Sequence, residues 1–137
     1  MGLILDSTIV IAAERRGNSP QQLVQQVIQL AGNQEAALSS IGLTELVHGI
    51  YRANSSEKRI RRQSFINELR SGLVVYPFTD ETALLAGRID GEQTAKGVNI
   101  PFIDLLIGAT ALSLGFSVLT ANLRHFKLIP GLNIVSL

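Results

Sequence analysis

Residues 2–16, GLILDSTIVIAAERR, decide the fold class of this chain. The short apolar run from Gly2 to Leu5 has the length and composition of a buried strand, and Asp6 follows it directly. Residues from about Ser7 to Arg16 then have the character of a helix. A strand followed at once by a helix is typical of α/β folds, in which helices connect parallel strands.

The same alternation continues along the chain. Ser19 and Pro20 supply an N-cap and a proline at the first helical position, and Gly32 ends that helix. Further helices are expected after Ser40, after Ser55 or Ser56, after Thr79 and over residues 103–114, with strands at 36–39, 73–76, 117–120 and, at a sheet edge, 133–136. We therefore expect an α/β three-layer sandwich with a mainly parallel central sheet, formed by residues 1–137 as a single domain.

The composition narrows the classes of function. The chain is 46% hydrophobic and 17% charged, so apolar surface is available for a protein partner. A formal net charge of +1 argues against coating of nucleic acid by bulk charge. The absence of cysteine excludes a disulfide framework and a thiolate zinc site, and it agrees with a reducing cytoplasm.

No membrane association is expected. The uncharged stretch 105–123 is nearly as long as the roughly 20 residues of a membrane span, but it contains several glycine, serine and threonine residues. Gly115 lies where a helix C-cap would fall, so helix, turn and buried strand is the better interpretation. The N-terminal segment lacks the basic region of a secretory signal and places Asp6 within its apolar stretch.

Three acids differ from the others because each is embedded in apolar sequence: Asp6 in LILDSTIVI, Glu45 in IGLTELVHGI and Asp104 in IPFIDLLIGA. An ionised carboxylate in such surroundings is costly unless something compensates it. A divalent cation does so, and Mg²⁺ and Mn²⁺ prefer oxygen ligands. Each acid alone also fits a helix cap, an ion pair or the end of an element, and their spacing does not establish that they converge.

Four ordered segments resemble the motifs of the PIN-domain ribonucleases, specifically the VapC toxins of bacterial toxin–antitoxin pairs. They are LDSTIVI at 5–11, LTELVHGI at 43–50, GVNIPFIDLLIGATAL at 97–112 and VLTANLRHF at 118–126. The resemblance extends from Leu3 to Phe126. It implies a PIN-like fold and a Mg²⁺- or Mn²⁺-dependent endoribonuclease that cuts RNA, forms a homodimer and is inhibited by a cognate antitoxin protein.

The resemblance also assigns site residues. It implies that Asp6, Glu45 and Asp104 bind the metal and that Asn122 occupies a fourth catalytic position. Many members of the family have an aspartate at that position, and an asparagine brings no charge. Occupancy of a second metal site is therefore open.

Several polar residues are candidates for substrate binding. Thr8 and Thr120 fit contacts to a phosphate oxygen, or else hydroxyls at a strand end and a helix cap. Arg124 shares a loop with Asn122 and is expected to contact RNA, whereas His125 is expected to orient that loop. Half of the basic residues lie between positions 52 and 70, where they form either an RNA-binding face or a solvated helix face. Gly108 either leaves room for substrate or allows close helix packing.

Other functions remain as alternatives. Asn122 is compatible with a PIN-like module that binds RNA or protein without cleaving. A haloacid-dehalogenase-type phosphohydrolase requires a second aspartate where Thr8 stands. A di-iron site requires a second Glu-x-x-His motif beside Glu45 and His48, and none exists, so His48 is expected to be a half-buried packing residue.

Overall fold

A parallel sheet of five strands forms the centre of the computed structural model, which describes residues 1–137. The strands are β1 (Gly2–Leu5), β2 (Glu35–Ser39), β3 (Val74–Tyr76), β4 (Ser117–Leu119) and β5 (Ile134–Val135). They lie in the order β3-β2-β1-β4-β5, and every neighbouring pair is parallel. The predicted parallel sheet, with its last strand at an edge, is confirmed.

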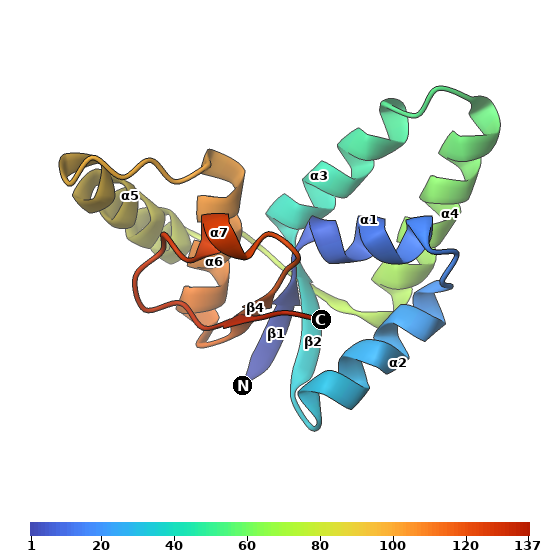
Figure 1. Cartoon of the computed structure of the whole chain (residues 1–137), viewed down its shortest axis with the longest axis horizontal. Coiled ribbons are helices and arrows are strands. Elements are labelled where there is room, and N and C mark those ends of the chain that lie inside the picture. The colour runs from blue at the N-terminus through green and yellow to red at the C-terminus, as the bar shows by residue number, and fades with distance from the viewer.

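Helices cover both faces of this sheet (Figure 1). One layer contains α1 (Ser7–Arg15), α2 (Pro20–Ala31), α3 (Ser40–Tyr51) and α4 (Ser56–Gly72), and the other contains α5 (Asp80–Ala95), α6 (Phe102–Leu114) and α7 (Leu123–Phe126). The predicted three-layer α/β architecture is therefore confirmed. No helix has the length and apolar character needed to cross a lipid bilayer.

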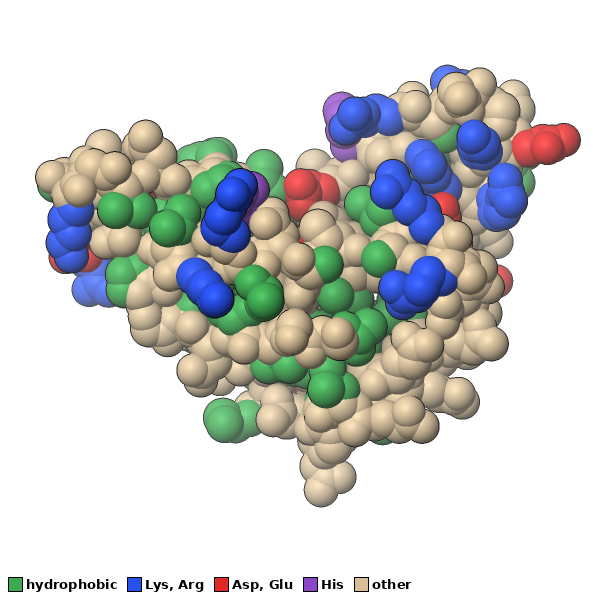
Figure 2. All heavy atoms as spheres, viewed as in Figure 1, with side chains coloured by type: hydrophobic (Ala, Val, Ile, Leu, Met, Phe, Trp, Pro, Cys, Tyr) green, Lys and Arg blue, Asp and Glu red, His purple; other side chains and the backbone are tan.

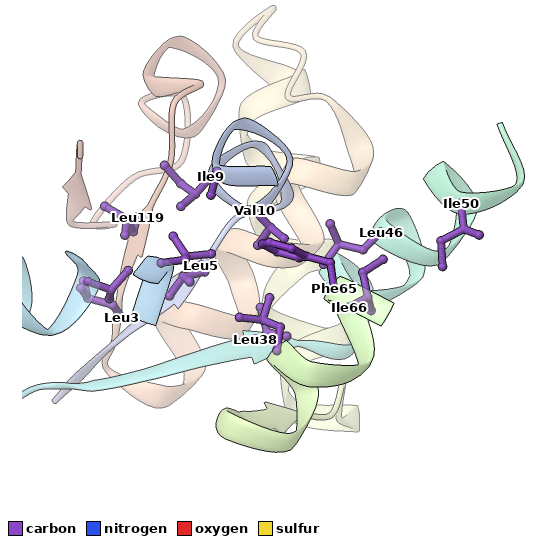
Figure 3. Close-up of a cluster of buried hydrophobic side chains, with 14 residues drawn as sticks. Leu3, Leu5, Ile9, Val10, Leu38, Leu46, Ile50, Phe65, Ile66 and Leu119 are labelled. Carbon is purple, nitrogen blue, oxygen red and sulfur yellow. The ribbon is translucent and has the colours of Figure 1, made fainter. Parts of the chain in front are cut away.

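Successive side chains of a strand point to opposite faces of the sheet, so the interior contains two hydrophobic cores. Leu3 and Leu5 face the α1–α4 layer, where they join Leu38 and Leu119 together with side chains of all four helices (Figure 3). Ile4 points to the opposite face and packs in the cluster of the α5–α7 layer. Each of these strand side chains has at most 2% of its surface exposed, so β1 is buried on both faces.

The helices begin at the expected polar residues, with one shift. Ser19 caps α2 and forms a reciprocal capping box with Gln22. For α3, Ser39 is the cap, because its hydroxyl accepts from Gly42 N at 2.9 Å. The prediction of Ser40 as the cap was wrong by one residue, since β2 leads into α3 without a loop and Ser40 instead accepts from Phe78 N.

The strand order reverses at β1 and β4. From β1 the chain moves outward through β2 to β3, and it then crosses to the other side of β1 to form β4. In open α/β sheets, ligands bind beyond the carboxyl ends of the strands at such a reversal. Asp6 and Thr120 are the residues that follow these two strands.

Candidate active site

Asp6 is a buried carboxylate at the end of β1, with 1% of its surface exposed. Its Oδ2 accepts hydrogen bonds from the Thr8 and Thr120 hydroxyls, both at 2.8 Å. Its Oδ1 is equally buried and has no hydrogen-bond partner. Leaving a buried charged oxygen unpaired is costly, and a bound cation is the kind of partner that removes the cost.

The two threonines also tie the loop after β4 to Asp6. Thr120 Oγ1 accepts from the backbone N–H of Asn122 at 2.8 Å, and Thr8 Oγ1 accepts from that of Ala121 at 3.2 Å. Thr120 has no exposed surface. Both hydroxyls therefore donate to Asp6 from the ends of their elements, and their contact with substrate stays a prediction.

Glu45 enters the site from α3. Its Oε1 accepts from the Ser7 hydroxyl at 2.8 Å, which lowers its pKa, but burial outweighs this contact and raises the pKa above the ordinary value. The negative charges of Asp6 and Asp104 raise it further. Sequence reasoning did not assign a role to Ser7, although its position directly after Asp6 was a usable signal.

Asp104 enters from the first turn of α6, where the helix dipole favours a negative charge. Its Oδ2 lies 2.7 Å from Nδ1 of His125. Burial raises the pKa of Asp104, the contact with His125 lowers it, and the charge of Asp6 raises it again. The net direction is upward, as expected for a carboxyl that shares a pocket with other acids.

The charges of Asp6 and Asp104 raise the pKa of Glu45, and the charge of Asp6 raises the pKa of Asp104. The three acids come from different elements and still lie close enough to affect one another. Acidic side chains lie at the base of a notch between two raised parts of the molecule (Figure 2). No three acidic or histidine side chains enclose a ready-made metal cage. An open set of carboxylates still fits Mg²⁺, which typically binds through one or two carboxylates, with waters and substrate phosphates as its other ligands.

The remaining candidates have distinct positions. Asn122 Nδ2 lies 2.7 Å from Nδ1 of His125, and Arg124 is exposed on α7, a short helix that the sequence had suggested only as a loop. His48 is exposed on α3, so its expected half-buried position was wrong. Gly108 allows close packing, because a Cβ there would overlap the end of the Ile129 side chain, which would have to shift.

The basic segment around α4 is divided between two roles. Arg59 and Arg62 hold the helix in place through hydrogen bonds to the carbonyl oxygens of Ala53 and Gly49, and Arg62 also forms an ion pair with Glu14 of α1. Other basic side chains of this segment are exposed: Arg52, Lys58, Arg61 and Arg70. These side chains, together with that of Arg59, which is also exposed, are available to form a positive face.

Comparison with known proteins points to one family. Residues 3–132 match the PIN domain family. Ribonuclease VapC1 of Rickettsia felis is 37% identical over 99% of this chain and 96% of its own length. The tRNA(fMet)-specific endonuclease VapC of Salmonella typhimurium is 33% identical over 71% of each chain. The crystal structure of VapBC2 from Rickettsia felis, bound to a DNA fragment from its promoter, contains a similar chain. The two chains superimpose with a TM-score of 0.86 at 28% identity, and the match covers 100% of this chain and 99% of the other.

The chain therefore belongs to the PIN-domain family. Within that family, its relatives over nearly the full length are VapC ribonucleases. These relatives favour a nuclease over the alternative of a non-cleaving binding module.

Proposed function

We propose that this chain is a metal-dependent endoribonuclease that hydrolyses RNA phosphodiester bonds and acts as the toxin of a toxin–antitoxin pair. The observation that carries the proposal is the buried, unpartnered Oδ1 of Asp6 beside two other acids. The relatives named VapC support the reaction class. We infer a cytoplasmic site of action, where cellular RNA would be accessible to the chain.

The acid set matches Mg²⁺ or Mn²⁺. Asp6, Glu45 and Asp104 offer only carboxylate oxygens, which these ions prefer over sulfur or imidazole. When bound, such an ion supplies Lewis-acid catalysis at a phosphodiester and neutralises the clustered negative charge. Burial, and to a smaller extent the charge of neighbouring acids, raises the pKa values of Glu45 and Asp104, and a bound cation would favour their charged forms.

The residues of the chain contribute orientation and charge. The Thr8 and Thr120 hydroxyls fix Oδ2 of Asp6, so that Oδ1 remains free for the ion. The Ser7 hydroxyl holds one oxygen of Glu45 in the same way. Such contacts preorganise a site before substrate arrives, which lowers the cost of assembling it.

RNA would be held through its backbone by cations around the notch. Arg124 lies on α7, which begins directly after Asn122, and its side chain is exposed. The exposed basic side chains in the first half of α4, Lys58 and Arg61, add positive charge on the other layer. Each phosphate contact would strengthen binding by a salt-dependent amount.

Two protein partners complete the proposal. The VapBC complexes among its structural relatives support a cognate antitoxin for this chain. A homodimer is supported by exposed apolar side chains on neighbouring helices, among them Leu84 of α5 and Phe102 of α6. The composition, low in charge, agrees with two such interfaces.

Two substitutions at the acids test the proposal. Asp6→Asn and Asp104→Asn each remove one negative charge with little change of shape. We expect both to abolish Mg²⁺- and Mn²⁺-dependent RNA cleavage and the growth arrest caused by expression. Glu92→Gln, on the exposed surface of α5, is the matched control and retains both activities. Full cleavage by either variant at Asp6 or Asp104 would refute the assignment of the site.

A further inference from the structure

The ring of His125 contacts both Asp104 and Asn122, and the proposed function assigns no role to these contacts. Its Nδ1 lies 2.7 Å from Asp104 Oδ2 and also 2.7 Å from the side-chain amide of Asn122. The side chain of His125 is 31% exposed and that of Asp104 is 14% exposed. One ring nitrogen thus makes two short polar contacts at the edge of the site.

The chemistry of the three groups restricts these contacts. A ring nitrogen carries either one proton or one lone pair, so it acts as a donor or as an acceptor. The ionised carboxylate of Asp104 only accepts, and an amide NH₂ group only donates. If Nδ1 donated to Asp104, its proton would also face the protons of the Asn122 NH₂ group, and the two would repel each other. If Nδ1 instead accepted from that NH₂ group, the carboxylate of Asp104 would face the lone pair of Nδ1, which is also repulsive.

With Asp104 ionised, one arrangement satisfies all three groups. Nδ1 carries the proton, and the amide of Asn122 presents its carbonyl oxygen to the ring, since its two ends are nearly equal in size. The Nδ1–H group then donates to Asp104 Oδ2 and to Asn122 Oδ1 together. We propose that His125 is a positioning residue that fixes Asp104 and Asn122 through this shared proton, an inference that rests on the proposed function.

This arrangement assigns a role to Asn122 as well. Its carbonyl oxygen is engaged by His125, so its NH₂ group is the end that remains available. That group donates hydrogen bonds and is suited to an anionic oxygen of the RNA backbone, not to a cation. Asp104 keeps Oδ1, which accepts no hydrogen bond from another side chain, for the ion.

The first test is the protonation of the ring. The chain has two histidines, so long-range ¹H–¹⁵N spectra of the metal-free protein at neutral pH contain two ring systems. The variant His48→Asn assigns them, because His48 is exposed and makes no side-chain hydrogen bond. We expect a proton on Nδ1 of His125. A ring protonated only at Nε2 would overturn the proposal.

The second test measures Mn²⁺ binding by calorimetry without RNA. His125→Leu removes the donor, whereas His125→Asn returns an N–H group near the position of Nδ1. We expect His125→Leu to weaken Mn²⁺ binding by roughly 10- to 100-fold, the usual effect of losing such a contact, and His125→Asn to recover most of the loss. His48→Asn should bind Mn²⁺ as the unchanged chain does. Thermal unfolding of each variant verifies that it is folded.

The outcomes separate the inference from the proposed function. Unchanged Mn²⁺ affinity in His125→Leu, or equal weakening in His125→Leu and His125→Asn, would overturn the positioning role. If the unchanged chain neither bound Mn²⁺ nor cleaved RNA, the proposed function would fail. The ring spectrum would still report whether Nδ1 of His125 donates to Asp104.

Discussion

At the scale of single residues, the carboxylates of the candidate site carry a cost in stability. Glu45 and Asp104 have raised pKa values because burial and neighbouring acids disfavour their charged forms. The folded chain therefore holds protons at these positions more tightly than the unfolded chain does. Without a cation, the folded state loses stability as the pH rises above the ordinary pKa values of these groups.

A neutral side chain at position 104 should remove part of this cost. In the metal-free protein at pH 7, we expect Asp104→Asn to be more stable to urea than the unchanged chain. The difference should shrink as the pH falls to and below 3.8, the ordinary pKa of the carboxyl, because Asp104 then becomes protonated in both the folded and the unfolded chain. Urea unfolding in EDTA over a range of pH measures it. Lower stability of Asp104→Asn at pH 7 would contradict this account.

The threonine pair around Asp6 leads to a second prediction. Thr120→Val keeps the shape of the side chain but leaves Asp6 Oδ2 with Thr8 as its one remaining hydroxyl donor. We expect a fall of roughly 10- to 100-fold in Mn²⁺ affinity or cleavage rate, and recovery with Thr120→Ser, which restores the hydroxyl. Mn²⁺ titration and single-turnover cleavage measure the two effects. Normal binding and cleavage by Thr120→Val would show that the orientation of Asp6 does not depend on this contact.

The sequence indicated the acids of the site but not their hydrogen-bond partners. Asp6, Glu45 and Asp104 were detectable because charged residues are unusual in apolar surroundings. The contacts of Ser7 with Glu45 and of His125 with Asp104 join residues distant in the sequence. Contacts of this kind depend on how elements pack, and no local pattern encodes them.

At the scale of elements, strong local signals predicted most of the fold. Capping residues such as Ser19 and Ser55 begin helices where expected, because their side chains satisfy free backbone N–H groups. The four residues of α7 escaped prediction, since a single helical turn has no periodic pattern to detect. The sequence likewise could not distinguish Ser39 from Ser40 as the cap of α3, because either serine can cap a helix.

The interior of α6 provides a third prediction. Gly108→Ala would place a Cβ against Ile129, so we expect a loss of about 1–3 kcal/mol in the free energy of unfolding from overpacking. Gly87→Ala is the matched control, since an added Cβ on α5 meets no atom within 4 Å and should stabilise the helix by about 0.5–1 kcal/mol. Chemical denaturation compares the two. Equal effects would mean that α6 and Ile129 are less closely packed than described.

At the scale of the whole molecule, exposed apolar surface leads to a fourth prediction. Leu84 and Phe102 are 76% and 65% exposed on two helices that pack together. We expect a dimer at micromolar concentration, measured by light scattering, and we expect Phe102→Glu to shift it towards monomer by placing a charge in an apolar interface. Val74→Glu, exposed on the edge strand β3, is the control. A monomeric unchanged chain, or a Phe102→Glu dimer as stable as the original, would contradict this interface.

The three acids come from different layers of the sandwich, and this arrangement determines when the set is complete during synthesis of the chain. Asp6 ends a central strand, Glu45 belongs to the α1–α4 layer, and Asp104 belongs to the α5–α7 layer. The ribosome releases these layers in order, so a growing chain with its first layer folded still lacks Asp104 and His125. The set of acids is therefore completed only after α6 has been synthesised, and the contact of Asp104 with His125 only after α7.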